Sequence, residues 1–196
     1  MSSERERTYH HGDLRRAVLT AALDVIATEG PTGLSLRDLA RRAGVSHAAP
    51  AHHFKDRTGL LTAVAAEGYA LFADALTGAP DLRERGVAYV RFAATHPAHF
   101  QVMFQPDLYR TDDPDLLAAR ARATDALRAG VADLPPDGRG EDERLAGVAA
   151  WSLAHGFATL LLSGNLAEAL EGRDPEEAFR SLTGLVFAPE ERRDRP

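Results

Sequence analysis

The stretch spanning residues 34–54, LSLRDLARRAGVSHAAPAHHF, constrains the fold more than any other part of the chain. Ser35 is suited to cap a helix, and Asp38, three residues later, completes a capping-box pattern. Gly44 supplies a left-handed residue that ends this helix, and Ser46 is suited to cap a second short helix that finishes with the stretch. The pattern therefore predicts two short helices joined by a tight turn, which is a helix-turn-helix.

The first of these two helices is predicted to be amphipathic. Its apolar residues share one side at helical spacing: Leu36, Leu39, Ala40 and Ala43. Its basic residues fall outside that side: Arg37, Arg41 and Arg42. An apolar side that packs into a core beneath a basic outer side suits a unit that reads DNA.

The same stretch resembles the N-terminal domain of TetR/AcrR-type bacterial transcriptional regulators, which usually ends in a motif similar to GVSxxxLYxHFxxK. The matching residues are Gly44, Val45, Ser46, His53, Phe54 and Lys55. Two positions differ, since Pro50 replaces a leucine and Ala51 replaces an aromatic residue that often touches the DNA backbone. Pro50 is tolerable because it falls in the first helical turn. The change at Ala51 gives more weight to the neighbouring histidines.

The resemblance implies a DNA-binding surface on this unit. Arg37 is expected to reach a base, whereas Lys55 and Arg57 are expected to hold phosphate at the start of the next helix, where free amides assist. The full predicted set is Ser35, Arg37, Ser46, His47, Ala48, Ala49, Ala51, His52, His53, Lys55 and Arg57.

Charge is distributed unevenly along the 196 residues, whose net charge is -6. Residues 1–60 hold nine Lys or Arg, seven Asp or Glu and five of the eight histidines, whereas the rest holds fourteen against twenty-two. Basic charge is thus concentrated in the predicted DNA-reading part. The chain has no cysteine, which excludes disulfides and thiol catalysis. Without a signal-like start or an apolar run near about 20 residues, we expect a soluble cytoplasmic protein without a membrane partner.

The remaining patterns are helical throughout, and no alternating strand pattern or dinucleotide-binding glycine motif occurs. About nine helices are predicted, over residues 12–29, 36–43, 47–54, 57–76, 82–95, 97–105, 114–133, 141–166 and 175–188. The predicted fold is all-α, with a three-helix helix-turn-helix DNA-binding domain and a helical effector-binding and dimerisation domain. The expected divisions are 1–56, with 1–11 as a flexible arm, 57–188, and 189–196 as a disordered tail; residues 134–140 are predicted to form a loop.

The predicted helix over 141–166 is apolar on two sides and must be covered on both. One stripe comprises Trp151, His155, Ala158 and Leu162, and the other comprises Ala149, Leu153, Gly156, Leu160 and Gly164. One stripe can face the domain interior and the other a second subunit. The predicted dimer interface comprises Leu153, Gly156, Leu160, Gly164, Phe179, Leu182 and Val186. The sequence WSLAHG, with THPAHFQVMF upstream, resembles the W-x-x-x-H-G signature of one branch of TetR-like proteins.

Aromatic residues and methionine in the second domain are suited to a cavity for an apolar effector, although such residues at helical spacing also form ordinary cores. The candidate effector-binding residues are Phe72, Tyr89, Phe92, Phe100, Met103, Phe104, Trp151 and His155. His155 is either a ligand contact or a buried histidine satisfied by the backbone. His96 and His99 lack further metal-ligand spacing, so we predict no metal and no cofactor.

The sequence therefore predicts a homodimeric, ligand-responsive transcriptional regulator. We expect a repressor that binds a palindromic operator in double-stranded DNA and is released by a small apolar effector. One alternative is an all-helical enzyme, although no nucleophile beside a base, paired carboxylates or metal set is apparent. Another is a dimeric small-molecule-binding scaffold that has lost DNA reading, which the change at Ala51 suggests.

Overall fold

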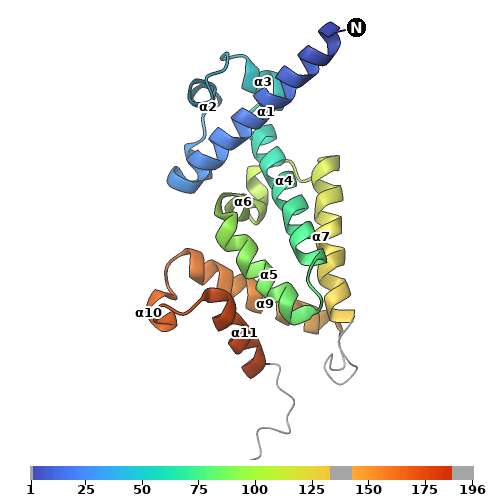
Figure 1. Cartoon of the computed structure of the whole chain (residues 1–196), viewed down its shortest axis with the longest axis vertical. Coiled ribbons are helices and arrows are strands. Elements are labelled where there is room, and N and C mark those ends of the chain that lie inside the picture. Colours follow the sequence, from blue (N-terminus) through green and yellow to red (C-terminus); the bar gives the residue numbers. More distant parts are fainter. Residues whose placement is uncertain (1, 133–142, 187–196) are drawn as a thin grey trace, which may run out of the picture. The chain divides into compact units, whose positions relative to one another are not determined.

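The computed structural model describes residues 2–132 and 143–186, and of residues 2–13 and 143 it describes the backbone alone. Within this part the chain forms ten α-helices and two short 3-10 helices and no strand (Figure 1). The α-helices are α1 (Ser2–Glu29), α2 (Leu36–Arg42), α3 (Ala49–Phe54), α4 (Arg57–Thr77), α5 (Leu82–Thr95), α6 (Pro97–Met103), α7 (Pro114–Ala132), α9 (Glu143–Leu162), α10 (Ala167–Leu170) and α11 (Pro175–Val186). The 3-10 helices are Pro31–Gly33 and Pro106–Leu108. The predicted all-α fold is confirmed.

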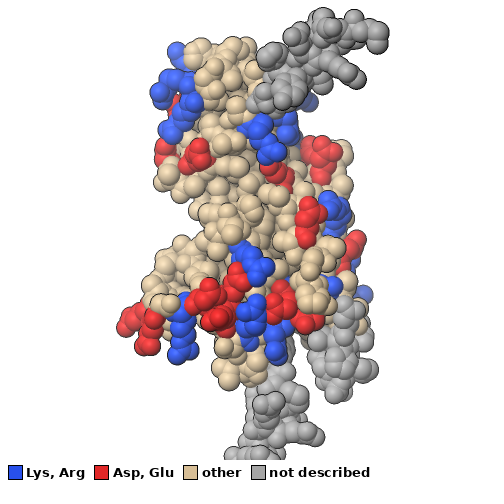
Figure 2. Space-filling view, viewed as in Figure 1, with Lys and Arg blue, Asp and Glu red and all other residues tan. Residues whose placement is uncertain are grey.

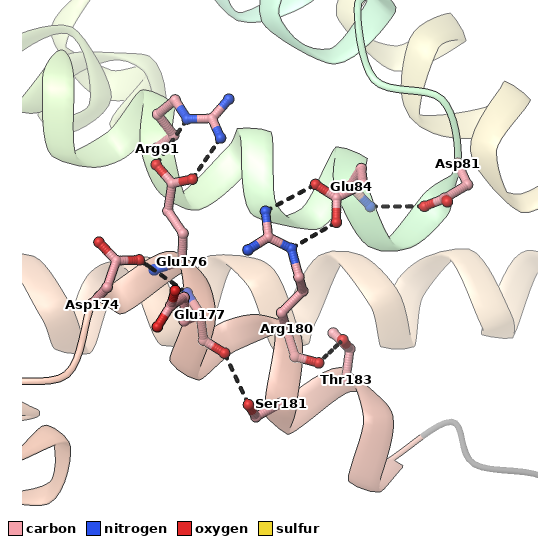
Figure 3. Close-up of polar contacts among 9 residues, drawn as sticks. All are labelled: Asp81, Glu84, Arg91, Asp174, Glu176, Glu177, Arg180, Ser181 and Thr183. Carbon is pink, nitrogen blue, oxygen red and sulfur yellow. Dashed lines mark hydrogen bonds and ion pairs between the residues drawn. The ribbon is translucent and has the colours of Figure 1, made fainter.

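Aspartate caps set the start of several helices. Asp56 accepts the amide of Gly59 at 2.8 Å, and Asp113 accepts the amide of Leu116 at 3.1 Å. Asp174 accepts the amides of Glu176 and Glu177 at 2.9 and 3.0 Å (Figure 3). Each side chain satisfies amide donors that a helix leaves without an intrahelical partner. The starts predicted at these three aspartates are confirmed.

The largest differences from the predicted helix limits occur in three helices. Helix α1 begins at Ser2, so residues 2–11, expected as an arm, continue the helix. Helix α3 begins at Ala49, because Ser46 lies in the preceding turn, where its carbonyl accepts the amide of Ala49 at 3.0 Å. Helix α9 ends at Leu162 and a separate turn of helix, α10, follows, because Gly164 adopts φ of 76°. The predicted loop 134–140 and tail 189–196 lie outside the described residues.

The chain divides into two compact units. The first comprises residues 1–69 and 98–119, and the second comprises residues 70–97 and 120–196. The boundary expected at residue 56 does not coincide with this division, since α4 begins in the first unit and ends in the second. Helix α6 and the first turns of α7 belong to the first unit. The chain therefore crosses between the units three times, within α4, at the start of α6 and within α7.

In the first unit, α1 packs against both α2 and α3 (Figure 1). Val18 and Ile26 of α1 are fully buried, as is Leu39 of α2, while Phe54 of α3 is 4% exposed. The guanidinium of Arg15 lies 5.5 Å from the centre of the Phe54 ring, within the range of a cation–π contact. These contacts hold the helix-turn-helix on α1.

In the second unit, α5 packs against both α9 and α11. Phe179 of α11 is 1% exposed, and its ring centre lies 5.2 Å from that of Phe157 of α9. A Cβ atom at Gly86 of α5 would lie 2.6 Å from the Phe179 ring, so the glycine makes the room for that ring. The assignment of Phe179 to a dimer interface was therefore wrong, because its ring fills the core of its own unit.

Two ion pairs hold α11 on α5 (Figure 3). Arg180 donates two hydrogen bonds to the Glu84 carboxylate, at 2.7 and 3.0 Å. Arg91 donates two to the Glu176 carboxylate, at 2.7 and 2.5 Å. The Arg180 guanidinium lowers the pKa of Glu84, which keeps that carboxylate ionised. Because each helix supplies one acid and one base, the paired arrangement favours one register and orientation of α11 on α5.

Candidate nucleic-acid interface

Helix α2 and the turn after it follow the predicted pattern in their backbone more than in their side-chain contacts. Ser35 occupies the N-cap position in an extended conformation, but its side chain accepts no capping hydrogen bond. Asp38 instead accepts hydrogen bonds from Arg41 at 2.5 Å and Arg42 at 2.6 Å, and these bonds lower the pKa of Asp38. The predicted capping box is thus replaced by an ion-pair network. Gly44 has φ of 66°, which confirms the left-handed residue after α2.

Helix α3 has one buried and one exposed side. Ala49, Pro50 and Phe54 are buried against the rest of the unit. Ala48, Ala51 and His52 are exposed, as is His47 in the preceding turn. His53 is half-buried, with its ring centre 5.2 Å from that of His52 and 6.2 Å from that of Phe54. The assignment of Ala49 to the DNA-facing surface was therefore wrong, because Ala49 faces the core.

The arginines of α2 differ in how they are engaged. Arg42 binds Glu29 of α1 at 3.0 Å as well as Asp38, and Arg41 binds Asp38. Arg37 is exposed and forms no ion pair with any residue of the described part of the chain. Figure 2 shows basic and acidic side chains interspersed over α2. Arg37 is thus the arginine of α2 that can approach a partner without breaking an ion pair.

The junction from α3 to α4 is a tight turn centred on Lys55. Lys55 has φ of 68° and ψ of -60°, and the amide of Asp56 donates to the carbonyl of Phe54 at 2.8 Å. These features define a γ-turn, which is rare for a residue with a side chain. The Lys55 side chain is exposed, whereas Arg57 is half-buried and donates to the Pro31 carbonyl at 2.7 Å. Of the two predicted phosphate contacts, Lys55 is the more exposed to solvent.

The candidate effector residues are divided between the two units. Phe72, Tyr89 and Phe92 are buried in the second unit, with the Phe72 ring centre 4.8 Å from that of Tyr89 and 5.0 Å from that of Phe92. Rings at these separations pack directly against each other, as core residues do. Three further candidates, Phe100, Met103 and Phe104, belong to the first unit.

Trp151 and His155 of α9 both meet the hydroxyl of Tyr89 of α5. That hydroxyl lies 2.9 Å from Nδ1 of His155, and Nε1 of Trp151 donates to it at 3.3 Å. Tyr89 is 1% exposed, whereas Trp151 is 44% exposed. Burial lowers the pKa of His155 and so favours its neutral form. Because an indole N–H can only donate, the phenol accepts that bond and can donate its own proton to Nδ1 of His155.

Helix α9 exposes a broad apolar side. Its most exposed large apolar residues are Leu145, Val148, Trp151 and Leu160. Its buried residues are Ala154, Phe157 and Ala158, which belong largely to neither of the two predicted stripes. A Cβ atom at Gly156 would meet nothing within 4 Å in the described part of the chain, so packing within the subunit does not require a glycine there. On α11, Leu182 is half-buried, while Leu185 and Val186 are exposed.

Two helices are long and apolar enough to span a membrane, judged by length and hydropathy alone. They are Arg57–Thr77 and Arg144–Leu162, and the expectation that no apolar run approaches such a length was wrong. Of the apolar window of the first, 56% is buried, as in the core helix of a globular protein, whereas only 17% of the second is buried. Of the two helices, α9 therefore leaves more of its apolar surface uncovered within the described part of the chain.

Comparison with known proteins places the chain in a class and then in a family. A helix-turn-helix that exposes one side of its second helix is typical of DNA-binding regulators. Residues 18–64 match the model for bacterial regulatory proteins of the tetR family, and residues 82–186 match the model for the tetracyclin repressor-like C-terminal domain. The chain belongs to the TetR family of transcriptional regulators. These domains indicate a DNA-binding, ligand-responsive regulator rather than an enzyme.

Solved structures agree with this assignment. A protein of unknown function from Rhodococcus sp. RHA1 is 34% identical, with 91% of this chain and 95% of that chain covered and a TM-score of 0.70. The TetR family transcriptional regulator PfmR from Thermus thermophilus is 24% identical, with 87% and 96% covered and a TM-score of 0.65. AibR, solved with isovaleryl coenzyme A and operator DNA, is 17% identical, with 90% and 99% covered and a TM-score of 0.66. A search of curated proteins gives no match.

Proposed function

We propose that the protein is a homodimeric repressor in the cytoplasm that binds a palindromic operator and is released by a small molecule. The observation that carries this proposal is the exposed side of α3. His47, Ala48, Ala51 and His52 are exposed there, and small alanines allow a helix to approach the base edges closely. Arg37 is exposed on α2 and makes no competing ion pair with the described residues.

In this proposal Arg37 and Lys55 have different roles. Arg37 reads a base, because a guanidinium can donate two hydrogen bonds to guanine in the major groove. Lys55 binds phosphate, and His52 and His53 contribute at the groove edge. Arg57 supports the domain through Pro31 and reaches phosphate only with its remaining donors.

Selection of binding sites from a random pool of double-stranded DNA tests the proposal. We expect an enriched site with two-fold symmetry whose half-site centres lie about 34–36 Å apart or at a nearby multiple. No enrichment would instead support the scaffold without DNA reading. An enriched site without symmetry would contradict the palindromic operator.

We propose that the apolar side of α9 is covered by a second copy of the chain. One short helix reads only a few base pairs, so useful specificity requires two copies. Between Leu145 and Leu162 the helix has no Asp, Glu, Lys or Arg, so its exposed side can meet itself across a two-fold axis without charge repulsion. Leu153, Gly156, Leu160 and Gly164 remain assigned to this interface together with Leu182 and Val186 of α11.

Light scattering at micromolar concentration tests the dimer. We expect the mass of two chains in the absence of lipid, and no sedimentation with neutral or anionic vesicles. A monomer that sediments with vesicles would assign the apolar side of α9 to a membrane instead.

We propose that the effector engages Trp151 and His155. A half-exposed indole and a neutral imidazole offer an apolar surface with one or two polar contacts, which is the composition of a small-molecule site. AibR was solved with an acyl coenzyme A together with its operator, so a similar fold accommodates both kinds of partner. Any effector must bind the DNA-free arrangement more tightly, since a ligand shifts an equilibrium by differential affinity alone.

Small molecules that co-purify with the protein provide the probes for this site. An identified molecule should weaken operator binding by the wild type. His155→Ala should blunt that response while ligand-free operator affinity stays within about twofold. An unchanged response would remove His155 from the effector site, and chemical turnover of the molecule would favour the enzyme alternative.

A further inference from the structure

The turn between α3 and α4 is strained, because Lys55 carries a side chain at φ of 68° and ψ of -60°. In this region an L-residue brings its Cβ too close to its own backbone, so glycine is the residue that adopts it readily. Strained backbone persists only where the surrounding structure determines it, and it is often found at functional sites. The restraints around Lys55 therefore indicate what the turn is for.

The first restraint is the close approach of α3 to α4 at Gly59. A Cβ atom at this position would lie 2.0 Å from the Phe54 carbonyl oxygen and 2.7 Å from Nη1 of Arg110. Neither the backbone oxygen nor the first turn of α4 could accommodate a side chain there. The last carbonyl of α3 is thus seated directly against α4, with the Arg110 guanidinium beside it.

The second restraint comes from Arg110, which lies between α6 and α7. Its Nη2 donates to Oδ2 of Asp56 at 2.6 Å, while Oδ1 of Asp56 caps the amide of Gly59. The Arg110 amide also donates to the Thr62 hydroxyl at 3.0 Å, and that hydroxyl donates to the Thr58 carbonyl at 2.7 Å. Arg110 therefore holds α4 at its first turn through a side chain and at its second turn through the backbone.

The segment that carries Arg110 is itself fixed to the first unit. The hydroxyls of Tyr69 and Tyr109 both donate to the carbonyl of Met103, at 2.9 and 2.8 Å. Both tyrosines are buried, and a Cβ atom at Gly68 would lie 2.7 Å from Sδ of Met103. The segment that carries Arg110 is therefore held in place by buried contacts.

We propose that Arg110 is a positioning residue for DNA reading: by bracing Asp56 and the start of α4, it holds the strained turn at Lys55 and thereby the orientation of α3. The inference rests on the proposed reading of DNA by α3. The amide of Gly59 and the charge of Arg110 lower the pKa of Asp56, so the Asp56 carboxylate is ionised at neutral pH. Arg110 needs no contact with DNA in this role.

A direct phosphate contact by Arg110 predicts a different pattern. If Arg110 acted through its charge alone, Asp56→Asn would strengthen DNA binding, because it removes a negative charge. A positioning role predicts that Asp56→Asn weakens binding, since asparagine keeps the cap on Gly59 but loses the ion pair. Loss of a phosphate contact would also reduce the salt dependence by about 0.9 in the log–log slope, whereas loss of positioning would not.

The test measures operator affinity of the full-length protein by fluorescence anisotropy on the selected site. We expect Arg110→Ala to weaken binding about 3- to 10-fold and Asp56→Asn to weaken it about 2- to 5-fold. The double variant should bind no more weakly than Arg110→Ala alone, because both substitutions remove the same contact. Arg122→Ala is the matched control, since it removes the same charge and breaks a similar ion pair, to Asp74 at 2.5 Å in the second unit. It should leave affinity within about twofold.

The inference would be overturned by tighter binding of Asp56→Asn, by additive effects of the two substitutions, or by equal losses for Arg110→Ala and Arg122→Ala. Should Arg110→Ala prove poorly folded in thermal unfolding, Arg110→Lys is the second variant. It keeps the charge and the backbone contact while losing the guanidinium group, and it should still weaken binding.

His52→Ala and Arg37→Ala test the proposed DNA-reading surface separately from the role of Arg110. Unchanged affinity in both variants would refute the proposed surface, whereas losses there without a loss at Arg110 would refute this inference alone.

Discussion

The helix-turn-helix and helix α9 differ in the kind of side chain that they expose to solvent. Helices α2 and α3 are 7 and 6 residues long, and they expose arginine and histidine beside a few buried apolar side chains. Helix α9 is 20 residues long, and it exposes Leu145, Val148 and Leu160 while presenting no charge over most of its length. The first surface is well hydrated when alone, whereas the second keeps a large apolar area in water.

This contrast separates two kinds of partner by their chemistry. Leaving apolar surface in water costs roughly 25 cal/mol per Å², so α9 gains most from an apolar partner. The DNA-reading surface gains from phosphate and base contacts, and its position matters more than its area. We therefore expect substitutions on α9 to act on assembly and those around α3 to act on affinity and sequence preference.

The largest effect is expected for Gly156→Leu on α9. Within the described part of the chain the new side chain would meet nothing within 4 Å of its Cβ, so the subunit should fold normally. A bulky residue at the proposed interface should shift the protein to monomer and weaken operator binding more than about 100-fold, because the two half-sites no longer act together. Light scattering and anisotropy measure both. Ala121→Leu on the exposed side of α7 is the control, and a dimeric Gly156→Leu would place the interface elsewhere.

A smaller and more selective effect is expected at the DNA-reading surface. Arg37→Ala should lose about 1–3 kcal/mol on the cognate site and relax the preference for one base pair. Lys55→Ala should weaken cognate and random DNA alike and reduce the salt dependence. Titrations of both DNAs at several salt concentrations distinguish these roles. Equal losses on both DNAs for Arg37→Ala would show that Arg37 does not read a base.

The strained turn gives a prediction about stability. Lys55→Gly and Lys55→Ala both remove the ammonium group, but only glycine relieves the strain at φ of 68°. We expect the free energy of unfolding of Lys55→Gly to exceed that of Lys55→Ala by about 1 kcal/mol. Urea denaturation provides the comparison. Equal stability of the two variants would mean that the turn carries no strain.

The smallest effect is expected where α11 meets α5. The folded pKa of Glu84 is lowered, chiefly by its hydrogen bonds to Arg180, so the stabilisation is complete above the unfolded pKa and is lost as the pH falls through the folded value. Because the pair is partly exposed, we expect about 0.2–1 kcal/mol. Glu84→Gln should lower the free energy of unfolding at pH 7. The difference in this free energy between the variant and the wild type should become smaller under acid conditions. Glu168→Gln on α10 is the control, and a constant difference between the Glu84 variant and the wild type at all pH values would contradict the assignment.

Local chemistry determined much of the fold from the sequence alone. The starts of α4, α7 and α11 follow from Asp56, Asp113 and Asp174, because a cap bonds to amides only two or three residues away. The end of α2 at Gly44 follows from a conformation that suits glycine. The exposed position of Arg37 follows from helical periodicity. Each of these depends on neighbours along the chain, which the sequence displays directly.

Tertiary structure decided which apolar residues are covered and by what. The family resemblance placed Ala49 on the DNA-facing surface, and Phe179 was expected at a dimer interface. Packing against other helices buries both, because neither a motif nor an amphipathic pattern names the partner of each side. The turn at Lys55 depends on Arg110, 54 residues beyond Asp56, and on the bare Cα of Gly59. No local rule links these positions, since only the folded chain brings a carbonyl, a carboxylate and a guanidinium to one point.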